Sequence, residues 1–162
     1  MAVEREIRIF INSVRYEVEA SLFSGDDELD FLDDDFGEIE PERMQIKTVG
    51  RYVIDGNRCE ISYDETDVTG MEGSVTSISF DMTDIGVVTM GRTGAVSTAL
   101  VFEKGKRHHC VYNTPYMPFE VCVKTLSVNN KIGEDGRLEL DYIVEIRGAK
   151  AERTKFSMKI MD

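Results

Sequence analysis

The sequence lacks the features that mark a secreted or membrane-spanning protein. No apolar run approaches the length of about 18 residues that a spanning helix needs. The first ten residues, MAVEREIRIF, include acidic side chains and no apolar signal-peptide core. The three cysteines, Cys59, Cys110 and Cys122, form no CxxC pair, and an odd, unpaired set is typical of reduced thiols. We therefore expect a cytoplasmic protein that makes no membrane contact.

The sequence also lacks a basic stripe, and this excludes the usual nucleic-acid partners. The formal net charge is −12, and ten of the 31 acidic residues lie between residues 26 and 42. The remaining 21 acidic residues nearly balance the 19 basic ones, so no surface is expected to neutralise phosphates. The acidic segment, residues 24–42, has no calcium-loop spacing and is predicted to be a solvated, mobile loop. Contact with a basic partner protein is the alternative for this segment.

Helical spacing is nearly absent, and alternation with a period of two residues takes its place. In residues 137–147, RLELDYIVEIR, apolar and polar side chains alternate with the one exception of Ile143. Residues 153–160 repeat this pattern. Strands with one apolar and one polar face are typical of antiparallel sheets. The fold class predicted here is therefore all-β and antiparallel.

Six to eight further strands follow the same rule along the chain. The first run changes phase between residues 7–11 and 14–18, and this predicts a β-bulge near Asn12 and Ser13. The segment DGN at residues 55–57 predicts a hairpin, and Asp81 and Asp84 are interpreted as turn formers. Short connections favour an up-and-down barrel of eight to ten strands over a two-sheet sandwich. We expect residues 1–162 to form this one domain, with the acidic insertion after the first strand.

The segment HHCVYNTPY at residues 108–116 holds both histidines of the chain but predicts no metal centre. On a strand, His108 shares a face with Cys110, Tyr112 and Thr114, while His109 lies on the opposite face. The two histidines therefore cannot bind one metal ion from this strand, and no cysteine pair has ligand spacing. We expect no metal and no cofactor, and Cys110 is interpreted as a buried free thiol.

Four motifs give the chain a resemblance to a known family. They are ISYDE at residues 61–65, MGRTG at 90–94, YNTPY at 112–116 and GRLELDY at 136–142. In this order the chain resembles the YwiB-like family, uncharacterised bacterial proteins with a calycin-like (lipocalin-like) β-barrel. The resemblance implies a closed barrel in the bacterial cytoplasm and no established activity. The chain departs from the family in its long acidic segment and in Met117, where a glycine is usual.

Several polar residues share the apolar faces of their strands, and they are the candidate site. Glu65 lies in phase with Ile61, Arg92 in phase with Met90, and the others follow the same rule. We expect them to meet at one mouth of the barrel, with Glu65 paired to Arg92. The predicted ligand-binding residues are Tyr63, Glu65, Arg92, Tyr112, Thr114 and Tyr142.

This cluster has three interpretations that the residues alone leave open. An ion pair with surrounding hydroxyl groups can close the end of the barrel, or it can form the polar end of a pocket for a small, partly apolar molecule. In the pocket, Arg92 would orient an anionic group of the ligand. In an enzyme, Glu65 would act as a base and Tyr112 or Tyr142 as an acid, but no nucleophile elbow or phosphate loop accompanies them. We assign no catalytic residue, and non-catalytic binding is the preferred function.

The outer face provides an alternative function. Val53, Val101 and Ile143 fall on faces that the alternation assigns to solvent. If clustered, they would form a dimer interface or a contact with another protein. A monomer and a homodimer are both compatible with the sequence.

Overall fold

The computed structural model describes residues 2–18, 41–65, 73–94, 97–113, 118–146 and 150–161. Ten strands and one short helix make up this part of the chain. The strands of the first half are β1 (Ala2–Val18), β2 (Glu42–Asp55), β3 (Arg58–Asp64), β4 (Val75–Asp81) and β5 (Asp84–Thr93). The second half contains β6 (Thr98–Glu103), β7 (Arg107–Asn113), β8 (Pro118–Lys131), α1 (Ile132–Asp135), β9 (Arg137–Ile146) and β10 (Lys150–Ile160).

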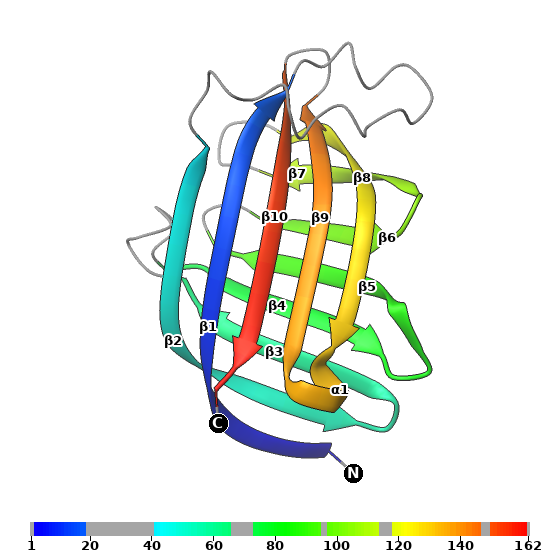
Figure 1. Cartoon of the computed structure of the whole chain (residues 1–162). Coiled ribbons are helices and arrows are strands. Elements are labelled where there is room, and N and C mark those ends of the chain that lie inside the picture. Colours follow the sequence, from blue (N-terminus) through cyan, green and yellow to red (C-terminus); the bar gives the residue numbers. More distant parts are fainter. Residues whose placement is uncertain are drawn as a thin grey trace.

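All ten strands belong to one antiparallel sheet that folds into a nearly closed barrel. The strand order is β6-β5-β4-β3-β2-β1-β10-β9-β8-β7. Strands that follow one another in sequence therefore pair, except β6 and β7, and β1 pairs with β10. In Figure 1 the strands β1, β10, β9 and β8 form one layer, and β3 to β6 cross behind them at a steep angle. The two ends of the sheet, β6 and β7, lie next to each other. The predicted up-and-down barrel is therefore confirmed.

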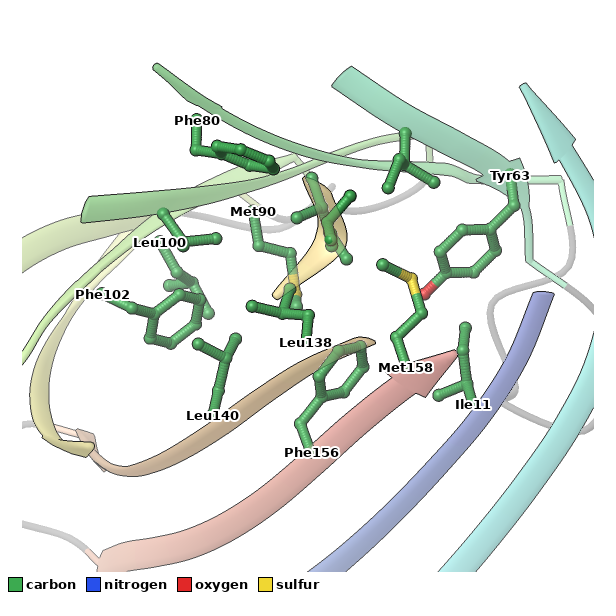
Figure 2. Close-up of a cluster of buried hydrophobic side chains, with 14 of the residues drawn as sticks. Ile11, Tyr63, Phe80, Met90, Leu100, Phe102, Leu138, Leu140, Phe156 and Met158 are labelled. Carbon is green, nitrogen blue, oxygen red and sulfur yellow. The ribbon is translucent and has the colours of Figure 1, made fainter. Parts of the chain in front are cut away.

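The barrel interior is filled by large apolar side chains from both layers. Phe102 and Leu138 are fully buried, and Leu140, Phe156 and Met158 are nearly so. Figure 2 shows these side chains facing one another across the interior, so that they fill the middle of the barrel. Burial of such side chains contributes about 1.5–3 kcal/mol each to folding and is the main stabilising term. The middle of the barrel is therefore packed with side chains.

The turn chemistry expected from the sequence is present where the structure describes it. Asp55 pairs with Arg58 across the β2–β3 hairpin, and Gly56 has φ 63°. That φ lies in the left-handed region, which glycine adopts without steric cost. At the β4–β5 turn, Thr83 donates hydrogen bonds to Asp81 Oδ1 from its backbone N–H at 2.8 Å and from its hydroxyl at 2.6 Å. The interpretation of Asp81 as a turn former is confirmed.

The predicted β-bulge in the first strand is wrong. The ladders from β1 to β10 and from β1 to β2 run through Asn12 and Ser13 in unbroken register. Ser13 continues the inward phase of Ile9 and Ile11 and is itself buried. The apolar residues Val14 and Tyr16 instead lie on the outer face, where they are half-buried. An interior serine therefore produced the apparent change of phase.

Candidate functional site

A row of polar residues crosses four neighbouring strands on the inner face of the barrel. Tyr63 of β3 lies opposite Thr76 of β4, Thr76 lies opposite Arg92 of β5, and Arg92 lies opposite Thr98 of β6. Each residue is in phase with core residues of its own strand, so all four side chains enter the interior. The row lies where β3 and β5 end and β4 and β6 begin.

Glu65 follows β3 and adds a buried carboxylate to this row. Its backbone N–H donates to the Ser74 carbonyl oxygen at 2.8 Å, which extends the β3–β4 pairing beyond Asp64. The Glu65 side chain is only 2% exposed. An isolated carboxylate at this depth would be strongly disfavoured, and it therefore requires a charged or hydrogen-bonding partner.

Arg92 and Thr76 are the partners of that carboxylate. Arg92 Nη2 lies 3.4 Å from Glu65 Oε2, and the guanidinium side chain is 18% exposed. The Thr76 hydroxyl donates to the same oxygen, Oε2, and accepts a hydrogen bond from Arg92 Nε at 3.0 Å. The predicted Glu65–Arg92 pair is thus present, and Thr76 links its two members.

Tyr63 borders the ion pair and connects it with the apolar core. Its pKa is raised well above the ordinary value, first by burial and then by the negative charge of Glu65. Arg92 and a hydrogen bond shared with Thr76 act in the opposite direction. Figure 2 shows its ring among the core side chains, with the hydroxyl group pointing towards the middle of the cluster. Tyr63 therefore stays un-ionised and offers a neutral hydroxyl beside the charged pair.

Two buried polar atoms at this site have no hydrogen-bond partner in the described part of the chain. One is Glu65 Oε1, and the other is the Thr98 hydroxyl oxygen. Thr98 lies directly opposite Arg92 in the β5–β6 ladder, so both atoms belong to the same polar row. Buried polar atoms are nearly always paired, and an exception is expected where a ligand or water completes the site.

The remaining predicted site residues differ in how far the structure describes them. Tyr142 of β9 is buried, its ring centroid lies 4.5 Å from that of Phe102, and its charge state affects Tyr63 electrostatically. Tyr112 lies in β7 with its backbone opposite Phe119, and its side chain is outside the described residues. Thr114 also lies outside them. The structure thus brings together Tyr63, Glu65 and Arg92.

Sequence reasoning missed Thr76 and Thr98. Both begin runs that alternate like their neighbours, Thr76 with Ile78 and Phe80, and Thr98 with Leu100 and Phe102. The phase rule that identified Tyr63 and Arg92 would have placed these threonines on the inner face as well. Their proximity to Arg92, however, depends on the register between strands, which single-strand periodicity does not contain.

The other reactive side chains form no second centre in the described ranges. His109 is exposed, while His108 lies 3.5 Å from Glu103 through its Nε2 atom. Cys110 is buried and accepts a hydrogen bond from the Val101 backbone N–H, while burial raises the pKa of its thiol. Among the residues that the structure describes, no group of three His, Cys, Asp or Glu side chains could hold a metal ion.

The outer surface carries an open depression beside the β4–β5 turn, away from the polar row. The residues that line it are Arg58, Ser79, Phe80, Asp81, Asp84, Val87 and Thr89. Of the outer-face residues named from the sequence, Val53 and Val101 are half-buried, and Ile143 is only 1% exposed. Ile143 is therefore not available for a surface contact. In the described segments, no helix is long and apolar enough to cross a membrane.

Comparison with known proteins agrees with this architecture. The chain is similar in structure to the ywiB protein from Bacillus subtilis, with a TM-score of 0.68 and 20% sequence identity. That likeness covers 98% of this chain and 94% of the other, and at this identity it concerns the fold. No curated protein matches the chain. Residues 33–158 match the model of a domain of unknown function, DUF1934. The chain therefore belongs to the DUF1934 family, the YwiB-like proteins.

Proposed function

We propose that this protein binds a small, partly apolar molecule without catalysis, at the end of the barrel interior that holds Glu65 and Arg92. The observation that carries this proposal is the buried Glu65 carboxylate, of which only one oxygen is engaged. A polar group of the ligand would occupy the unused side of the carboxylate. The apolar part would contact the core around Tyr63 and the neighbouring strands.

The barrel architecture supports a binding function. A small barrel has an interior that is either filled by side chains or holds one small ligand. Here the middle is filled, while the end at the polar row has convergent polar groups beside an apolar wall. This combination is the common character of small-molecule sites. The resemblance of the sequence to calycin-like barrels also favours the binding of a small molecule.

The geometry gives less support to catalysis. Glu65 engages Thr76 and Arg92 through Oε2, and the raised pKa of Tyr63 makes its phenol a weak acid. A general base and acid need pKa values near the working pH to be effective. The proposal therefore assigns Glu65 and Tyr63 to binding.

Native mass spectrometry of protein purified gently from its own host tests the proposal. We expect a stoichiometric small-molecule adduct on the wild-type chain and its loss in Arg92→Ala. Because Arg92→Ala leaves a buried carboxylate without its partner, Tyr63→Phe provides a milder second variant. Arg51→Ala is the matched control, since Arg51 pairs with Glu4 on the exposed surface. Wild-type protein without an adduct, or an adduct that persists in both site variants, contradicts the proposal.

A further inference from the structure

The hydrogen bonds around Glu65 indicate which kind of polar group the site accepts. We infer that the ligand presents a neutral hydrogen-bond donor, a hydroxyl or an amide N–H, to Glu65 Oε1. This inference rests on the proposed binding function and specifies its ligand class. The sequence allowed for an anionic group held by Arg92, whereas the arrangement of donors and acceptors favours a neutral donor.

The donors of Arg92 that face the cluster are already engaged. Its Nε donates to Thr76 at 3.0 Å and its Nη2 to Glu65 at 3.4 Å, so the guanidinium charge is balanced by the carboxylate. An anionic ligand would have to draw Arg92 away from Glu65. It would then place a second negative charge beside a carboxylate that is 2% exposed, and like charges repel strongly in such surroundings.

The unused atom is an acceptor. Glu65 Oε2 accepts from both Thr76 and Arg92, whereas Oε1 has no donor in the described residues. A buried acceptor without a donor is costly, and a donor on the ligand would recover this free energy. A neutral donor also preserves the charge balance of the pair, while an ammonium group would lie close to the Arg92 guanidinium.

Thr98 adds a second place for a polar atom. Its hydroxyl oxygen is buried and unpartnered in the described part of the chain, on the opposite side of Arg92 from Thr76. A hydroxyl both donates and accepts, so it accommodates either kind of neutral polar group. The row thus offers one acceptor and one adaptable group, and it has no unpaired buried cation.

The test compares three probes with the same six-carbon chain: 1-hexanol, hexanoate and hexan-1-amine. Each is titrated at pH 7 into the full isotope-labelled chain, and binding is followed by amide chemical shifts at the end of β3 to β6. We expect hexanol to bind about tenfold more tightly than hexanoate, because the hydroxyl group can donate a hydrogen bond to Oε1 and a carboxylate group cannot. We expect hexan-1-amine to bind more weakly than 1-hexanol.

Glu65→Gln provides the decisive variant. It removes the charged acceptor and leaves Arg92 without its counter-ion, so hexanol should lose about tenfold in affinity and hexanoate should gain. Glu139→Gln makes the same charge change at an exposed position of β9, where Glu139 pairs with Asn129, and should leave both affinities unaltered. If Glu65→Gln fails to fold, the order of the probes on the wild-type chain decides the question.

The outcomes separate the two proposals. Hexanoate binding as tightly as hexanol, or an acidic molecule identified as the natural adduct, overturns the neutral-donor inference and leaves the binding function intact. Absence of shifts with all three probes, together with absence of a natural adduct, overturns the binding function and this inference with it. Hexanol preference that reverses in Glu65→Gln supports both.

Discussion

At the scale of single residues, the Glu65–Arg92 pair is sensitive to substitution because its carboxylate is only 2% exposed. Removing one member of a desolvated ion pair leaves the other as an uncompensated buried charge. We expect Arg92→Ala to lower the free energy of unfolding by about 3–5 kcal/mol, measured by urea denaturation. Arg51→Ala removes an exposed pair and should cost at most about 1 kcal/mol.

A second substitution separates the cost of the unpaired charge from the value of the pair. The double variant Glu65→Leu with Arg92→Met removes both charges and keeps apolar volume. We expect it to be more stable than Arg92→Ala, because no buried charge is left alone. An Arg92→Ala variant that unfolds within about 1 kcal/mol of the wild type would show that Glu65 is not effectively buried.

Tyr52 makes the stability of the fold sensitive to alkaline pH. Burial first, and then a hydrogen bond with Cys59, raises the pKa of Tyr52 to about 12, although the Arg5 guanidinium 5.1 Å above the ring acts against this. In the unfolded chain the pKa is near the ordinary value of 10. The tyrosine therefore stabilises the fold fully below pH 10, and this contribution is lost as the pH rises towards 12.

The measurement for Tyr52 is the free energy of unfolding in urea at several pH values between 9 and 12. We expect a smaller decline in Tyr52→Phe than in the wild type, because the variant has no phenol to ionise at this position. Burial also raises the pKa of Tyr63, but Tyr63 is present in both proteins and contributes to both declines. Equal declines in the two proteins would contradict a role of Tyr52 in the pH dependence.

At the scale of strands, Gly50 is required by the close approach of β1, β2 and β3. It lies opposite Ile7 of β1 and Tyr63 of β3, and a Cβ atom there would come 2.6 Å from the Ser62 carbonyl oxygen. Because that atom belongs to the backbone, it cannot move aside without disturbing the ladder. We expect Gly50→Ala to cost about 1–3 kcal/mol in urea denaturation.

Gly86 provides the control for this prediction. It also lies in a strand, β5, but a Cβ atom at this position would meet no atom within 4 Å. Gly86→Ala should therefore be neutral or slightly stabilising, since alanine restricts the unfolded chain more than glycine does. If both substitutions had the same effect, crowding at Gly50 would not be the cause.

The strands themselves were predictable because one face of each strand is buried. Period-two alternation located the strands and the two faces of β9, and it placed Tyr63, Glu65 and Arg92 on the inner side. It failed at Ser13, where a polar residue occupies an interior position, and at Ile143, which is buried although it faces outward. Periodicity tells which residues share a face, but not whether the rest of the chain covers that face.

The site was only partly predictable for a related reason. The Glu65–Arg92 pair followed from phase and charge, since an acid and a base on apolar faces need each other. The intervening Thr76 and the flanking Thr98 depend on the register across three hairpins. A shift of one residue in any of these hairpins would turn a whole strand over, and hairpin lengths are the least certain part of a sequence-based prediction.

At the scale of the whole molecule, the reactivity of the three thiols measures how far the barrel shields each of them from solvent. Cys59 is fully buried and Cys110 is 8% exposed, while Cys122 is half-buried, and burial raises the pKa of all three thiols. We expect the Cys122 thiol to react with a disulfide reagent much faster than the other two thiols in the native protein. Cys122→Ser should therefore abolish the fast phase. Three equal rates would contradict the burial described here.

The seam between β6 and β7 determines where the barrel is weakest. In the described ranges these strands approach each other without a paired ladder, and the Val101 N–H donates to the Cys110 sulfur. A thiol is a weak acceptor, so this contact replaces a ladder hydrogen bond poorly. By contrast, β1 has a paired strand on each side, β2 and β10.

Amide hydrogen exchange tests this difference between seam and centre. Local opening is easiest where backbone hydrogen bonds are few and hardest in strands held on both sides. We expect the amides of β1 from Ile9 to Ser13, which is paired on both sides, to exchange at the rate of global unfolding, and Val101 to exchange by a local opening that depends little on denaturant. Equal protection of Val101 and the β1 amides would mean that the barrel closes at β6 and β7 as firmly as elsewhere. In that case the molecule would open only as a whole, and any ligand would have to enter through the end of the barrel where the polar row lies.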